Sequence, residues 1–273
     1  MRKLWTLGLA VFTCILVFTF AVWGEEKLPP LQPHPLPPAL AQWQDSSKSG
    51  DYFTEIKPTP AGYLVWSQFP IKVFVEPEKN SQEVSLNKVG AGLADNLAIA
   101  AKELKQNPPV PTAKELTKSA PTKWVNAAWE AIKEWNIYLP LEVVEDSNIA
   151  DILIWRSAPA WKPIFDRNTG RFQLPRARTA EARYEFYRRQ TAKGETVLSQ
   201  RFTIQVNPNK VSDYILPTMR HELGHALGIW GHSPVETDAL YFSQVRDSQP
   251  ISQRDVNTLK RIYQQPTRLG WKL

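Results

Sequence analysis

The feature that most constrains this chain is a histidine-rich stretch between residues 221 and 233, which reads HELGHALGIWGHS and holds three of the chain's four histidines. At 3.6 residues per helical turn, His221 and His225 lie one turn apart on the same face, so both imidazoles can reach one cation at about 2.0–2.1 Å. Glu222 projects about 100° around the helix, beside that cation, where it can accept a proton from a water molecule. The stretch therefore predicts a helix with a metal site and a general base.

A third ligand is available from the residues that follow this helix. Gly228 can take the left-handed conformation that ends a helix and turns the chain back, and this turn can deliver His232 to the same ion. Three histidines leave a tetrahedral zinc one position for water, as a catalytic site requires. Glu236 and Asp238 are the alternative third ligands, and either would make a different kind of zinc enzyme.

The whole run resembles the metzincin zinc signature H-E-x-x-H-x-x-G-x-x-H, and the following Ser233 resembles the matrixin branch of that family. The chain departs from the signature at one place, because Gly231 stands where the family has its third histidine and His232 comes one residue later. A wider turn between Gly228 and Gly231 would absorb the additional residue.

The resemblance implies a zinc-dependent endopeptidase that acts on a protein or peptide substrate, with calcium as an additional ion because calcium sites are common in matrixins. It also implies an extracellular site of action. Carried over residue by residue, it assigns one catalytic zinc to His221, His225 and His232, and the general base to Glu222.

A second departure concerns the methionine turn that metzincins place beneath the metal. Residues 239–243 read ALYFS and resemble the matrixin segment A-L-M-Y-P, but Tyr241 replaces the methionine. Tyr241 could form an aromatic floor or direct its hydroxyl at the site, and the sequence leaves both open. The single cysteine, Cys14, lies in the N-terminal apolar run, so neither a disulfide nor the cysteine switch of matrixins is expected in the exported part.

Residues 1–24 have the pattern of an export leader, since Arg2 and Lys3 precede an apolar run at 4–23. Cleavage near Gly24 would give a secreted or periplasmic protein, whereas an uncleaved run is long enough to anchor the chain in a membrane. The net charge of +6 is modest for 273 residues and gives no basis for a nucleic-acid partner.

The remaining chain divides into a proline-rich linker or pro-region at 25–60 and a matrixin-like domain at 61–273. Residues 28–38 contain six prolines and are interpreted as an extended spacer in which His34 is incidental. An alanine-rich segment at about 76–120 is interpreted as an insertion into the domain, without an assigned role.

The fold class predicted for 61–273 is α/β (α+β): a twisted mixed sheet packed on a long helix and the zinc helix, with a C-terminal helix after them. Strands are expected at 71–75, 141–144, 152–155, 183–188 and 201–206. The strand at 183–188 is assigned to the sheet edge above the metal, where the resemblance implies pairing with an extended substrate.

Three helices complete this prediction. The first spans 121–136 and buries one apolar stripe. The zinc helix begins at a cap provided by Ser212 or Asp213. The last helix opens with the capping box Ser252-x-x-Asp255 and stops before Pro266. The residues assigned to the apolar stripe are Trp124, Val125, Ala128, Trp129, Ile132 and Trp135.

Overall fold

The computed structural model describes residues 28–78, 122–160, 164–167, 169–173, 178–209, 212–243 and 250–273. The predicted leader at 1–24 and nearly all of the predicted insertion at 76–120 lie outside these residues. Within the described ranges, no helix is long and apolar enough to cross a membrane.

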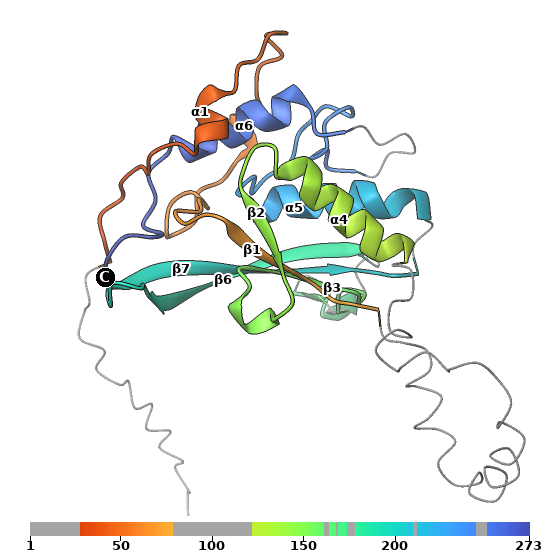
Figure 1. The fold of residues 1–273 in the computed structure, drawn as a ribbon. Coiled ribbons are helices and arrows are strands. Elements are labelled where there is room, and N and C mark those ends of the chain that lie inside the picture. The colour runs from red at the N-terminus through yellow and green to blue at the C-terminus, as the bar shows by residue number, and fades with distance from the viewer. Residues whose placement is uncertain are drawn as a thin grey trace, which may run out of the picture.

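A five-stranded sheet forms the base of the domain (Figure 1). Its order is β2-β1-β3-β7-β6, in which the first four strands are parallel and β6 runs antiparallel to β7. β6 therefore stands at an edge, which confirms the edge position expected for 183–188. The strands are β1 (Ile71–Val75), β2 (Leu141–Val144), β3 (Ile152–Trp155), β6 (Ala180–Gln190) and β7 (Thr196–Val206).

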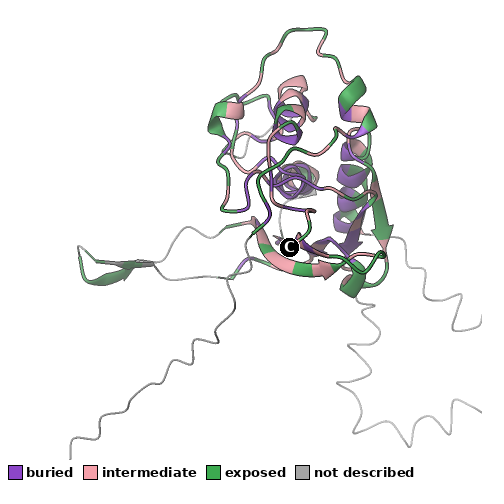
Figure 2. Cartoon of the chain, turned by 90° about the vertical axis from the view of Figure 1, so that its left-hand side faces the viewer, coloured by how far each residue is buried: buried purple, intermediate pink, exposed green. Residues whose placement is uncertain are grey.

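The helices lie on one side of this sheet (Figure 1), so the chain is a mixed α/β protein, as predicted. α4 (Lys123–Trp135) and α5 (Ile215–Ala226) cover the sheet, while α6 (Gln253–Tyr263) and the short α1 (Pro38–Gln42) lie beyond them. Single 3-10 turns occur at η1 (Phe53–Glu55), η2 (Ser147–Ile149) and η3 (Ser212–Tyr214). A separate hairpin of β4 (Ile164–Asp166) and β5 (Arg171–Gln173), which the sequence did not predict, projects from the body in Figure 2.

The core fills the space between sheet and helices, where the buried residues gather in Figure 2. β7 alternates as predicted, and its inward side chains Phe202, Ile204 and Val206 are fully buried. The stripe of α4 is buried as predicted except at Trp129, which is 46% exposed. Trp129 lies about 100° around the helix from the centre of the stripe at Ala128, so the prediction for this one residue was wrong.

The two predicted helix caps have different outcomes. The capping box of α6 is present, with the Ser252 hydroxyl accepting the Asp255 N–H and the Asp255 carboxylate accepting the Ser252 N–H. The cap predicted for the helix that carries His221 and His225 was wrong. η3 runs directly into α5, and Tyr214 is the N-cap residue, whose side chain does not cap the helix, because the preceding 3-10 turn already continues the helical backbone.

The interpretation of residues 28–38 as a spacer was also wrong, because the segment up to residue 60 packs onto the domain. Gln32 and Thr267 exchange two backbone hydrogen bonds of 3.1 and 3.0 Å. The ring of His34 stacks on Trp271 at 4.3 Å, and its Nε2 lies 2.7 Å from the Leu269 carbonyl oxygen. The segment is thus a structural part of the domain, and His34 is one of its attachment points.

Candidate metal centre

Helix α5 presents its two histidines to the same point. His221 and His225 are one turn apart, and their Nε2 atoms lie 3.1 Å from each other. Two nitrogens bound to one tetrahedral zinc at 2.0–2.1 Å would be about 3.3 Å apart. The backbone alone therefore brings the two nitrogens almost to the separation that a shared zinc requires.

The second nitrogen of each ring is held by a backbone carbonyl. His221 Nδ1 lies 2.9 Å from the Ala239 oxygen and His225 Nδ1 lies 2.7 Å from the Ile229 oxygen. A carbonyl only accepts hydrogen bonds, so both Nδ1 atoms carry the proton, and in neutral rings both Nε2 lone pairs face each other. Burial, reinforced by the neighbouring His221, lowers the pKa of His225 well below its ordinary value and keeps that ring neutral. A cation between the lone pairs relieves their repulsion, which is the arrangement that metal-binding histidines adopt.

His232 reaches this pair through the turn that follows α5. Gly228 has φ +126°, and a Cβ there would lie 2.5 Å from the Leu64 carbonyl oxygen. The ring of His232 lies 5.3 Å from that of His221 and 4.8 Å from that of His225. Ligand atoms of the three histidines lie within 4.8 Å of one another. The structure therefore brings together the three predicted ligands, and their donor set fits zinc.

The alternative third ligands lie outside this cluster. Asp238 is buried, accepts a hydrogen bond from the Ser233 hydroxyl, and pairs with Arg254 at 3.1 Å. Glu236 is exposed, and no group of potential ligands within the described ranges includes either carboxylate. Asp238 instead fixes the residue that directly follows His232.

The floor beneath the histidines is aliphatic. Leu240 is fully buried, and its side chain approaches α5 so closely that a Cβ on Gly224 would lie 2.6 Å from it. Tyr241 does not line the cleft described below, and its ring packs on Phe242 at 4.5 Å. Neither role that the sequence left open for Tyr241 is therefore seen, because its neighbour Leu240 occupies the place under the helix.

A buried carboxylate holds this floor in position. Asp255 of α6 accepts the N–H of Ala239 at 2.9 Å and the hydroxyl of Tyr52 at 2.6 Å. The carbonyl of the same Ala239 orients His221. A hydrogen-bonded path thus runs from the first turn of α6 to a histidine of the cluster.

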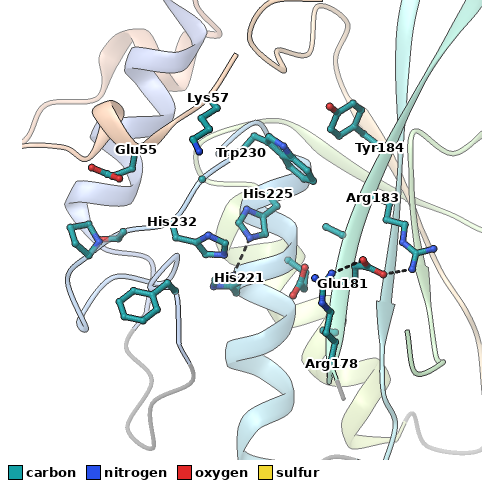
Figure 3. A pocket seen from close by; sticks show the side chains of 17 residues that line it. Glu55, Lys57, Arg178, Glu181, Arg183, Tyr184, His221, His225, Trp230 and His232 are labelled. Carbon is teal, nitrogen blue, oxygen red and sulfur yellow. Dashed lines mark hydrogen bonds and ion pairs between the residues drawn. The ribbon is translucent and has the colours of Figure 1, made fainter. Parts of the chain in front are cut away.

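A cleft of about 1090 Å³ opens over the three histidines and Glu222. The first residues of β6 form one wall, and the opposite wall carries Glu55 and Lys57 from the N-terminal segment (Figure 3). Trp230 packs edge-on against Tyr184 of β6 at 4.9 Å between ring centres and closes one end of the histidine cluster. The arrangement offers an extended molecule a path along a sheet edge, past a metal site and a carboxylate.

Several residues of this site could not be found from the sequence. Glu55 and Lys57 belong to a segment interpreted as a linker or pro-region, and no local pattern brings them to residue 232. Gly224 was part of the histidine motif, but its need for a small side chain depends on Leu240, which is distant in sequence. Among the residues that support the site, Asp255 is the one for which the sequence carried a signal, because the capping box placed it in the first turn of a helix.

A scan of the chain against protein-family models found no match, and a search of curated proteins found no matching relative. The inference of function consequently rests on the chemistry of the site.

Proposed function

We propose that the protein is a zinc-dependent endopeptidase of the metzincin type. The observation that carries the proposal is the facing pair of His221 and His225, whose Nε2 atoms lie 3.1 Å apart while both Nδ1 atoms are held by carbonyls. When both rings are neutral and carry their protons on Nδ1, the two Nε2 lone pairs repel each other unless a cation lies between them, and with His232 the pair forms a three-nitrogen site. The open side of that site faces a cleft rather than the core.

In this proposal His221, His225 and His232 would hold the zinc, which would act as a Lewis acid on a carbonyl group and would lower the pKa of water to about 7. Glu222 lines the same cleft and is 8% exposed, so it can take a proton from water and return it to the leaving amine. The carbonyls of Ala239 and Ile229 keep two of the imidazoles in the tautomer that leaves Nε2 available.

The substrate would lie in extended form along β6. Because β6 is an edge strand and its residues 180–184 line the cleft, its outer N–H and C=O groups can pair with a peptide backbone. Such pairing tolerates many side chains and would hold a peptide bond across the three histidines. If the leader at 1–24 acts as predicted, this chemistry takes place outside the cytoplasm or at the membrane surface.

The decisive experiment compares the purified protein with its Glu222→Gln variant. We expect one zinc per chain in both proteins by elemental analysis, and hydrolysis of unfolded casein by the wild type that a chelator abolishes. The variant should lose about 10²–10⁴-fold in rate, the usual contribution of a general base. Undiminished cleavage by the variant would remove Glu222 from the mechanism.

The same samples test the two alternatives. Zinc without casein hydrolysis in the wild type would favour a non-catalytic, zinc-stabilised binding module. A His232→Ala variant with full zinc affinity would favour an acidic third ligand, but the hydrogen bonds of Asp238 to Ser233 and Arg254 argue against this role for it.

A further inference from the structure

Lys57 lies on the wall of the cleft that faces β6. Its backbone is fixed next to the histidine turn, since its N–H donates to the Trp230 carbonyl oxygen at 3.4 Å. The side chain is exposed and lines the cleft, and its amine extends toward the side where Trp230 and His232 lie (Figure 3). The cation is therefore within the path that a substrate would follow.

The charges of the opposite wall are already paired among themselves. Arg178 donates to one oxygen of Glu181 at 2.8 Å, and Arg183 pairs with the other oxygen. Two guanidinium groups thus share one carboxylate, and this wall retains a net positive charge.

In the part of the chain that the structure describes, Lys57 has no such partner. Among the ion pairs of the described residues none involves its amine, and the carboxylate of the nearby Glu55 points away from it in Figure 3. The charged groups lining the cleft are three cations and three anions: Lys57, Arg178, Arg183, Glu55, Glu181 and Glu222. Among these cations, Lys57 is the one without an ion-pair partner in the described residues, so its charge is available to a substrate.

We propose that Lys57 anchors a subsite for an acidic side chain of the substrate, so that the enzyme favours peptides with glutamate or aspartate near the cleaved bond. This inference rests on the proposed function. Trp230 lines the same cleft and offers an apolar surface, against which the methylene groups of a glutamate side chain can pack while its carboxylate meets Lys57.

The first test measures binding without catalysis. Fluorescein-labelled decapeptides of glycine, alanine and leucine carry a single Glu, Gln or Lys that is moved along the chain, and fluorescence anisotropy records their affinity for zinc-loaded Glu222→Gln protein. We expect one Glu position to bind about two- to fivefold more tightly than its Gln counterpart, the usual range for a solvent-exposed ion pair. The preference should shrink in 0.5 M salt.

Charge reversal then identifies the residue responsible. Adding Lys57→Glu should transfer the preference at that position from the Glu peptide to the Lys peptide. The matched control is Lys193→Glu, since Lys193 is exposed in the turn between β6 and β7, at the end of β6 away from the cleft. An unchanged preference in Lys57→Glu, equal affinity of Glu and Gln peptides, or no binding by any peptide would overturn the inference.

The casein assay separates this inference from the proposed function. If the wild type cleaves casein and the Lys57 substitution leaves peptide preference unchanged, only the acidic subsite is wrong. If the wild type binds zinc and selects Glu peptides through Lys57 but cleaves nothing, the subsite stands and the peptidase assignment fails.

Discussion

Replacement of Gly231 by alanine tests whether the N-terminal segment shapes the candidate metal centre. A Cβ at this position would lie 2.4 Å from the Glu55 carbonyl oxygen and 2.9 Å from Ile56 Cδ1. Ordinary non-bonded contacts are about 3.5 Å, so the two backbones would have to separate by roughly 1 Å. Because Gly231 directly precedes His232, much of that displacement would fall on His232, the proposed third ligand.

Two quantities should change together. Overpacking of this kind costs about 1–3 kcal/mol, which urea unfolding of the metal-free protein would record as a loss of stability. We also expect zinc affinity to fall about 10–100-fold, as it does when a residue that orients a ligand is altered, and competition with a fluorescent chelator measures this loss. Glu55→Ala is the matched control, since it removes the side chain but leaves the carbonyl against which Gly231 packs.

A double variant shows whether the effect passes through His232. If Gly231→Ala weakens zinc binding only by displacing this ligand, the substitution should cause no further loss in a His232→Ala background. Wild-type zinc affinity in Gly231→Ala would refute the reasoning, and so would an equal loss in both backgrounds.

Three further substitutions probe the support of the site. Leu240→Ala should cost about 2–5 kcal/mol of unfolding free energy because the side chain is fully buried, whereas Phe242→Ala, 65% exposed, should cost almost nothing; equal losses would contradict the assignment of Leu240 to the floor. Ser252→Ala should cost about 0.5–2 kcal/mol through the capping box, and an unchanged thermal midpoint would show that the cap is dispensable. Burial raises the pKa of Asp255 above 3.8, so the native state holds this proton more tightly than the unfolded chain and the carboxyl lowers stability as pH rises above 3.8. The stability of Asp255→Asn relative to the wild type should therefore rise with pH in urea titrations from pH 4 upward, and a difference independent of pH would contradict this.

Periodic patterns predicted the elements of the fold well. The alternation at 201–206 predicted a strand whose Phe202, Ile204 and Val206 are fully buried, and the box at Ser252 predicted the start of α6. Such patterns are local, because helix and strand periodicities depend on neighbouring residues. Trp129 is the informative failure, since an aromatic residue one position beyond a stripe looks apolar in sequence but is turned toward solvent.

The histidine cluster was predictable for the same local reason. One helical turn separates His221 from His225, which places both rings on the same face. Gly228 follows the end of this helix and has the positive φ that the sequence predicted. His232 required more, because its position depends on a loop and on whatever packs against that loop. The surface that packs there comes from residues 55–64, and contacts between segments so distant in sequence leave no periodic signal.

This dependence explains how the additional residue before His232 is accommodated. A longer turn has more conformations, and the entropy lost in selecting one of them has to be offset by contacts that hold it. The turn is confined between the Leu64 carbonyl at Gly228 and the Glu55 carbonyl at Gly231, while its Trp230 packs on Tyr184 of the edge strand. Beyond it, Ser233 is tied to Asp238. The segment at 25–60, interpreted from the sequence as a proline-rich linker or pro-region, is therefore part of what fixes His232, and the same segment places Lys57 over the cleft.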